Sequence, residues 1–374
     1  MLFTHLMKIV VFGLTVSSSW GNGHATLWRG LIRALVHLKH RVVFFERNTP
    51  YYAAHRDLDD LGHGQLMLYE SWDIVSPRAR RAMADADTII ITSYCPDALR
   101  ALRLVRDAAP GALLVFYDLD TPVTLARLVA GETVDYLPPE GLGDFDLVLS
   151  YTGGRALSAL RQLGAARTAA LYGHADPQVH APLTVAARTH LSYLGTYAAD
   201  RQPVLQELFI EPARRRPDRT FLIGGAAYPH DFPWQPNIAF VGHVAPGDHA
   251  AFFCASHLTL SVTRASMRAM GYCPSGRLFE AAACETVVLS DRWEGLANFF
   301  TPDEEILLAS STAEVMTLLD KPDTELRRIA RAARERVLAE HTSMHRAMEL
   351  VILLEETHSA GAREHSGVSH RHAS

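Results

Sequence analysis

The chain has 374 residues, of which 48% are hydrophobic and 21% charged, a globular composition with enough length for two domains. Its formal net charge of −5 leaves no broad basic face and argues against bulk binding of nucleic acid. The four cysteines lie far apart without a C-x-x-C pair, which excludes a disulfide framework and fits a reducing, cytoplasmic location. The longest apolar run near the start, Ile9–Leu14, is too short to span a membrane, so we expect no transmembrane segment.

The first half of the chain alternates short β-branched runs with segments of helical spacing. The predicted strands are Lys8–Leu14, Arg41–Glu46, Thr88–Thr92, Ala112–Tyr117, Phe145–Ser150 and Thr168–Gly173. The predicted helices are His24–Leu38, Pro96–Asp107, Thr121–Ala130 and Gly154–Leu163. Strands that alternate with helices predict a parallel, doubly wound α/β sheet, and we assign residues 1–174 to this first domain.

The same alternation restarts after a segment with two prolines and no periodicity, which we interpret as a linker over residues 175–189. A second α/β domain is predicted over residues 190–341, followed by a helix over 342–358. Residues 359–374 are small, polar and rich in histidine, so a disordered tail is predicted there. The strands of the second domain are predicted at Leu191–Leu194, Thr220–Ile223, Ile238–Val241, Leu258–Val262, Thr286–Ser290 and Glu305–Ala309.

One stretch of the second domain, RASMRAMGYCPSGRLFEAAACETVVLS from Arg264 to Ser290, predicts an anion site. A strand enters a loop that opens into a helix, so the free N–H groups of Ser275, Gly276 and Arg277 point out of the helix N-terminus. Glu280, one turn further on, can reach a neighbouring pair of hydroxyl groups. An anion beside a diol is what a nucleoside diphosphate presents.

The segments GYCPSGRLFEAAACET and DRWEGLANFFTPDEEILLA resemble the C-terminal half of GT-B glycosyltransferases, in particular the group related to the spore maturation protein CgeB. FGLTVSSSWGNGHATLWRGLIRAL and YDLDTPVTL also look like that group. The resemblance implies two Rossmann-like domains facing a central cleft, with the donor in the second domain, the acceptor in the first, and C-terminal helices that cross back. The donor-binding residues expected from it are Gly195, Thr196, Arg264, Tyr272, Ser275, Gly276, Arg277, Glu280, Gly295 and Leu296, and the acceptor-side loop contains Trp20, Gly21, Asn22 and Gly23.

The sequence departs from the family pattern at two positions. Retaining GT-B enzymes often carry two glutamates eight positions apart, and Glu280 matches the second, which touches the ribose. Tyr272 stands where the first, sugar-touching glutamate is expected, which favours an inverting mechanism. Glu285 stands where the family usually has glycine.

Three residues of the first domain are candidates for the catalytic base. Asp118 and Asp120 follow a predicted strand, and His24 begins the first predicted helix. Asp118-Leu119-Asp120 resembles a metal-binding D-x-D motif, but GT-B enzymes usually stabilise the leaving diphosphate with a helix dipole and cationic side chains, so no metal and no cofactor is expected. Structural roles stay open: a lone histidine is often structural, and arginines often form surface ion pairs.

Other functions stay open as well. Gly21-Asn22-Gly23-His24-Ala25-Thr26 mimics the G-x-G-x-x-G dinucleotide motif with Glu46 at the end of the next strand, but Thr26 replaces the third glycine and the loop comes seven residues after Leu14. A nucleotide-sugar epimerase of the same fold and a non-catalytic nucleotide-sugar-binding or structural protein are the remaining alternatives. The sugar, the nucleotide base, the acceptor and the oligomeric state are not predicted by the sequence.

Overall fold

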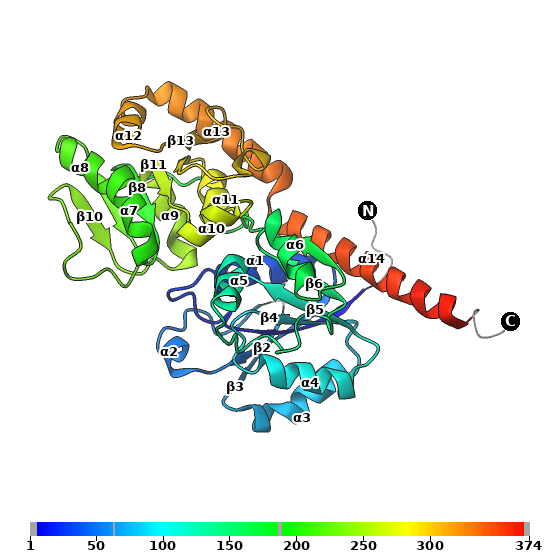
Figure 1. Cartoon of the computed structure of the whole chain (residues 1–374). Coiled ribbons are helices and arrows are strands. Elements are labelled where there is room, and N and C mark those ends of the chain that lie inside the picture. Colours follow the sequence, from blue (N-terminus) through cyan, green and yellow to red (C-terminus); the bar gives the residue numbers. More distant parts are fainter. Residues whose placement is uncertain (1–5, 63, 186–188, 370–374) are drawn as a thin grey trace. The chain divides into compact units, whose positions relative to one another are not determined.

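The structure, a computed structural model, describes residues 6–62, 64–185 and 189–369. The chain divides into two compact units, each with one sheet of its own (Figure 1). Unit 1 contains the chain up to Ser18, Leu31–Tyr172 and the segment from Met344 onwards, and unit 2 contains Ser19–Gly30 and Gly173–Ser343. Within the described residues, no helix is both long enough and apolar enough to cross a membrane.

Unit 1 is built on a seven-stranded parallel sheet in the order β3-β2-β1-β4-β5-β6-β7. Its strands are β1 (Lys8–Gly13), β2 (Arg41–Arg47), β3 (Gln65–Tyr69), β4 (Thr88–Thr92), β5 (Leu113–Asp118), β6 (Leu147–Ser150) and β7 (Thr168–Ala170). Its helices are α1 (His24–His37, which begins in unit 2), α2 (Pro50–Ala53), α3 (Trp72–Met83), α4 (Ala98–Ala108), α5 (Thr121–Val129), α6 (Arg155–Gln162) and α14 (Ser343–Ser369). The predicted doubly wound sheet is confirmed.

The core on one face of this sheet is formed by alternate residues of the strands. Val10, Phe12, Ile89, Ile91 and Phe116 belong to one buried cluster with the apolar faces of α3 and α4. These two helices pack against each other (Figure 1). The central strands are also buried at the intervening positions, as expected for a parallel sheet that is covered on both faces.

The sequence pattern did not predict β3 and α3. Gln65–Tyr69 is an edge strand with partly exposed side chains, so it lacks the continuous apolar run of the central strands. Pro77 lies inside α3, where a proline normally indicates the end of a helix because it cannot donate the backbone hydrogen bond. Burial of Trp72, Val75 and Met83 against the sheet outweighs that cost.

Unit 2 contains a six-stranded parallel sheet in the order β10-β9-β8-β11-β12-β13. The strands are β8 (Thr189–Leu194), β9 (Phe221–Gly224), β10 (Ile238–Val241), β11 (Ser256–Ser261), β12 (Val287–Ser290) and β13 (Leu307–Leu308). The helices are η1 (Ala199–Arg201), α7 (Gln202–Leu205), η2 (Gln206–Ile210), α8 (Glu211–Arg215), η3 (Pro246–Asp248), α9 (His249–Cys254), α10 (Ala265–Met270), α11 (Gly276–Ala283), η4 (Leu296–Asn298), α12 (Thr312–Leu319) and α13 (Asp323–Glu340). The second predicted α/β domain is therefore confirmed.

The helical stretch formed by α7, η2 and α8 is interrupted at η2, which is a π-helical segment. Pro212 lies just after it and has no N–H to bond the carbonyl one turn back, which favours the wider turn. Leu208 and Phe209 of this segment are buried in the core of unit 2.

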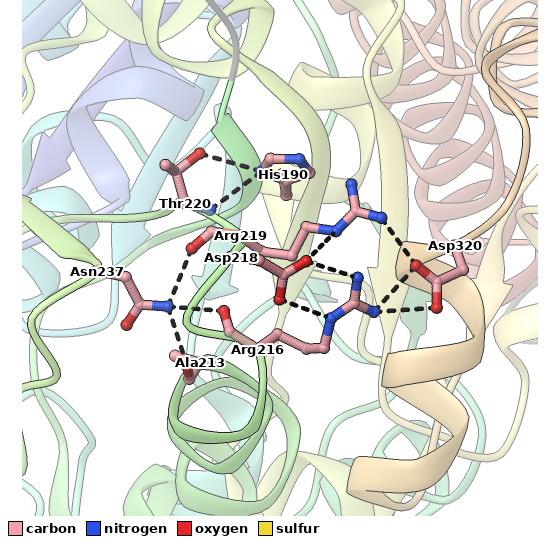
Figure 2. Close-up of polar contacts among 8 residues, drawn as sticks. All are labelled: His190, Ala213, Arg216, Asp218, Arg219, Thr220, Asn237 and Asp320. Atoms are coloured by element: carbon pink, nitrogen blue, oxygen red, sulfur yellow. Dashed lines mark hydrogen bonds and ion pairs between the residues drawn. The ribbon is translucent and has the colours of Figure 1, made fainter.

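A network of hydrogen bonds and ion pairs connects the amino-terminal ends of β8 and β9 with the neighbouring helices (Figure 2). Both Arg216 and Arg219 donate to the Asp320 carboxylate, at 2.9 and 2.8 Å. The amide nitrogen of Asn237 lies 2.9–3.0 Å from the carbonyl oxygens of Ala213, Arg216 and Arg219, which share its two N–H groups, and so terminates the α8 segment. This end of the sheet is therefore held by structural contacts, whereas open α/β sheets bind ligands at the opposite, carboxyl ends of their strands.

The backbone at Glu285 has the conformation that favours glycine, the residue that the sequence resemblance predicts at this position. The residue follows α11 with φ 56°, the left-handed conformation that glycine adopts without strain. The N–H of Glu285 bonds the carbonyl of Ala282 at 2.9 Å and that of Thr286 bonds Ala281 at 3.1 Å, a Schellman ending of the helix.

The unit boundaries differ from the predicted domains in three places. Ser19–Gly30, with the Trp20–Gly23 loop and His24, groups with unit 2 and not with the first domain. The segment predicted as a linker belongs to unit 2, where Ala175 pairs with Thr342, although 186–188 lie outside the described residues. α14 belongs to unit 1 and is helical to Ser369, where a disordered tail over 359–374 was predicted; residues 370–374 lie outside the described part.

Candidate functional site

The carboxyl ends of β8 and β11 carry the loops that form the candidate site in unit 2. These strands are neighbours in the sheet, and the order of connections reverses between them, which is where open α/β sheets bind ligands. The loop after β8 contains Gly195 and Thr196, and the chain after β11 leads through Arg264 and α10 to the N-terminus of α11. Two stretches predicted as donor-binding are thus brought together.

Close backbone approaches shape this site. A Cβ atom on Gly225, which has φ 143°, would lie 2.1 Å from the carbonyl oxygen of Gly195. A Cβ atom on Gly295, with φ 89°, would lie 2.4 Å from the ring of Tyr272. Glycine is required at both positions because any side chain would collide with the facing loop. Gly295 and Tyr272 therefore lie in contact.

The loop before α11 has an unusual backbone. Tyr272 adopts φ 49°, and its N–H donates to the carbonyl of Glu294 at 2.7 Å, which fixes the loop to the segment after β12. Ser275 precedes α11 in an extended conformation, and its side chain does not cap the helix. The first N–H groups of α11 are consequently left for another acceptor.

Three arginines gather at the same place. Arg264 donates through Nε to Asp200 at 3.1 Å, and Arg201 donates through Nη1 to the carbonyl of Thr196 at 3.3 Å. Burial lowers the pKa of Arg201, and the nearby positive charges of Arg277 and Arg264 lower it further. Such mutual repulsion between partly buried cations is relieved when an anion binds among them.

Two guanidinium N–H groups of this cluster have no protein acceptor. Among the described residues, no hydrogen-bond partner reaches the buried Nη1 of Arg277 or the buried Nε of Arg201. A buried donor without an acceptor costs about 1–3 kcal/mol, and more when it is charged. The cluster therefore has the chemistry of an anion site, with donors of the fork geometry that suits phosphate.

Glu280 adds one negative charge beside the arginines. Its side chain is buried, and its Oε2 atom lies 3.1 Å from Nδ1 of His249. Burial would raise the pKa of Glu280, but the hydrogen bond with His249 outweighs it and, together with the nearby charge of Arg277, lowers the pKa to about 2. The group is thus an ionised acceptor one helical turn from the anion site.

His180, His249 and Glu280 offer ligand atoms within 4.8 Å of one another, so we tested whether they suit a metal ion. Nδ1 of His180 accepts a hydrogen bond from the backbone N–H of Asp176 at 3.2 Å. A neutral imidazole with an accepting Nδ1 carries its proton on Nε2, so neither nitrogen presents a lone pair to a metal. The three residues therefore do not fit a resident cation.

Asp118 of unit 1 is fully buried at the end of β5. Its Oδ1 atom accepts the N–H of Asp120 at 3.1 Å, whereas no hydrogen bond of normal geometry reaches its Oδ2 atom among the described residues. Burial raises the pKa of Asp118 to about 6, and the negative charge of Asp120 acts in the same direction. The nearby hydroxyl groups of Thr124 and Ser93 lower the pKa of Asp118, but by less than burial raises it.

Asp120 lies at the N-cap position of α5 and is half-buried. Its side chain makes no capping bond, although its carbonyl accepts the N–H groups of Val123 and Thr124 at 2.8 and 3.1 Å. Its carboxylate is therefore not used to cap its own helix. The structure thus brings Asp118 and Asp120 together, and groups the third candidate, the buried His24, with unit 2.

The Trp20–Gly23 loop also lies in unit 2, where it contacts a residue that the sequence pattern did not reveal. The ring of Trp20 lies 4.7 Å from that of His243, and Oγ of Ser19 is 3.3 Å from its Nε2. His243 follows β10, at the carboxyl edge of the sheet that also carries Gly195. A histidine two residues after a short strand is too common a pattern to predict a site.

The dinucleotide interpretation of the first loop requires a free carboxylate at Glu46, and the structure shows an occupied one. Oε2 of Glu46 accepts the backbone N–H groups of Val16 and Ser17 at 2.7 and 2.9 Å, and Oε1 accepts the hydroxyl groups of Thr15 and Ser17 at 3.0 and 2.6 Å. Glu46 is therefore the anchor of the loop after β1.

A stability measurement tests the burial of Asp118. Because its pKa rises from 3.8 to about 6 on folding, the group contributes stability below pH 3.8 that is lost as pH rises through 6, about 3 kcal/mol in all. Asparagine does not titrate, so the Asp118→Asn variant does not lose this stability. The free energy of unfolding of the variant minus that of wild type should therefore increase by most of this amount between pH 4.5 and pH 7.5. Urea denaturation across this range measures it, and a difference independent of pH would contradict the burial of a titrating carboxyl group.

The comparisons with known proteins agree with this architecture. Residues 201–352 match a family model described as glycosyl transferase-like. No curated protein sequence matches the chain significantly. Among solved structures, sucrose-phosphate synthase from Thermosynechococcus elongatus superposes with a TM-score of 0.68 at 15% identity, covering 94% of this chain and 100% of that one.

Two further structures have the same fold. Anabaena Alr3699/HepE in complex with UDP and glucose gives a TM-score of 0.66 at 14% identity, and an alpha-glucosyltransferase in complex with UDP-glucose and DNA containing an abasic site gives 0.68 at 12%. Each covers 94% of this chain and is itself covered completely. The chain therefore has the GT-B glycosyltransferase fold, as the sequence resemblance predicted.

Proposed function

We propose that the protein is a glycosyltransferase that moves a sugar from a nucleoside diphosphate sugar to an acceptor. The observation that carries the proposal is the partly buried arginine cluster with two buried, unsatisfied N–H groups, beside the uncapped N-terminus of α11 and the ionised Glu280. Arg201, Arg264 and Arg277 are the proposed diphosphate ligands, and Glu280 is the proposed ribose ligand. The relation to the CgeB group and the cytoplasmic location stay predictions.

The first donor to test is UDP-glucose. Structures of the same fold were solved with UDP-glucose or UDP bound, which supports this choice of nucleotide and sugar. Some of these neighbours also contain DNA, but a net charge of −5 argues against a polyanionic acceptor for this chain. The acceptor is thus proposed only as a hydroxyl-bearing molecule.

The proposed reaction inverts the anomeric centre. The base removes the acceptor proton as the hydroxyl oxygen attacks the anomeric carbon, and the bond to the diphosphate breaks on the opposite side. Asp120 is the proposed base and Asp118 its positioning residue, since Asp118 binds the Asp120 N–H. Tyr272 in place of the sugar-touching glutamate of retaining enzymes supports inversion.

Two measurements separate this function from its alternatives. A thermal-shift screen over nucleoside diphosphates identifies the nucleotide base of the donor. A ligand at one hundred times its dissociation constant adds about 2.7 kcal/mol to the free energy of unfolding, so the preferred nucleotide stands out. Incubation with labelled donor then distinguishes a transferase, which transfers or hydrolyses the sugar, from an epimerase, which returns an isomeric nucleotide sugar. Binding with no turnover of any donor would indicate a nucleotide-sugar-binding protein.

We expect Glu280→Ala to weaken UDP binding by about 1–3 kcal/mol, the range of a hydrogen bond to a charged group. Isothermal titration calorimetry measures the change, and Glu304→Ala, which removes an exposed glutamate of the same unit, is the matched control. Equal UDP affinity in wild type and Glu280→Ala would remove Glu280 from the site.

We expect donor turnover to survive EDTA, because arginines and a helix N-terminus are proposed to stabilise the leaving diphosphate. Initial rates before and after chelation measure this. Loss of turnover that Mn²⁺ or Mg²⁺ restores would instead make Asp118 and Asp120 candidates for metal ligands.

A further inference from the structure

His249 makes a contact that the proposed mechanism does not yet use. It is the first residue of α9, and its Nδ1 atom lies 3.1 Å from Oε2 of Glu280 on α11. The side chains are 12% and 8% exposed, so the pair is largely removed from water. A hydrogen bond between such groups fixes the orientation of both side chains.

The direction of this hydrogen bond follows from the charge of Glu280. With its pKa lowered to about 2, the carboxylate is ionised at neutral pH and can only accept, so Nδ1 of His249 donates. Oε2 is thereby occupied. No protein donor among the described residues bonds the other oxygen, Oε1, which stays available to a ligand.

The imidazole of His249 is itself held in place. The ring of His180 stacks on it at a centroid distance of 6.0 Å and an interplanar angle of 29°, and Phe253 packs edge-on at 6.0 Å. His180 is fixed in turn by the Asp176 N–H. Two segments of unit 2, α9 and the one predicted as a linker, thus hold the ring that bonds the Glu280 carboxylate of α11.

We propose that His249 is a positioning residue that directs Oε1 of Glu280 at the ribose hydroxyl groups of the nucleotide, and so lets the site distinguish ribonucleotides from deoxyribonucleotides. The inference rests on the proposed donor function. A carboxylate held through one oxygen presents its second oxygen in one direction, as recognition of a particular hydroxyl group requires. Without His249 the carboxylate rotates and the hydroxyl contact loses its fixed geometry.

The test compares UDP, 2′-deoxy-UDP and inorganic pyrophosphate by calorimetry. Wild type should bind UDP about tenfold to a hundredfold more tightly than 2′-deoxy-UDP, the factor that a hydrogen bond to a charged group supplies. In His249→Ala this preference should disappear while pyrophosphate affinity stays at the wild-type value. His249→Asn, whose amide nitrogen can replace Nδ1 as donor, should recover part of the preference.

His249→Gln keeps the bulk but moves the donor away from the Nδ1 position, so it should behave like His249→Ala and serves if the alanine variant does not fold. His257→Ala, a histidine of β11 outside the site, should keep the wild-type preference. This inference alone is overturned if His249→Ala or His249→Gln keeps the wild-type preference for UDP over 2′-deoxy-UDP. It is also overturned if these variants lose affinity equally for UDP, 2′-deoxy-UDP and pyrophosphate. Failure of wild type to bind any nucleoside diphosphate overturns the proposed function as well.

Discussion

Asp120→Asn should lower kcat for sugar transfer by about 10²–10⁴ and leave donor affinity unchanged, the result expected when a general base is lost. Asparagine has the size of aspartate but cannot take the acceptor proton. The side chain of Asp120 does not cap α5, so the substitution should leave the helix intact. Single-turnover rates and calorimetry with UDP separate the chemical step from binding.

Two variants control this experiment. Asp118→Asn should lower kcat less, because Asp118 is fully buried and acts on the reaction through the Asp120 backbone. His24→Ala tests the other candidate base. Normal turnover in Asp120→Asn together with an inactive His24→Ala would assign the base to His24.

Most of the fold could be predicted from local pattern alone. Central strands such as β1 and β4 are continuous β-branched runs because both of their faces are covered, and that pattern is strong even in one sequence. β3 lies at the edge, and α3 contains Pro77, so neither shows the expected pattern. The regrouping of Ser19–Gly30 with unit 2 depends on tertiary packing and has no local signature.

Some residues of the candidate site could likewise be predicted from local spacing, and others could not. Gly276, Arg277 and Glu280 share one helix start, so their spacing alone predicts a combined anion and hydroxyl site. Arg201 and His249 join them only through the fold, from positions 76 and 31 residues before Arg277 and Glu280. The sequence therefore predicts the motif, and the structure adds the residues that hold it in place.

Ending the chain at His341 should abolish the folding of unit 1, because α14 supplies part of its core. Leu350, Val351 and Leu354 are fully buried in that helix, and burial of three such side chains contributes roughly 5–9 kcal/mol. This is comparable to the whole stability of a typical domain. Loss of the cooperative unfolding transition, or insolubility of the truncated chain, is the expected readout.

A chain that ends at His358 is the matched control. It keeps these three side chains and removes the tail, in which the sequence shows no apolar face, so it should fold and turn over donor as the full chain does. Leu354→Ala in the full chain tests the packing by itself, since deletion of a buried leucine side chain costs about 2–5 kcal/mol. A stable and active protein that ends at His341 would show that α14 is dispensable, and the buried face of this helix would then have no structural role.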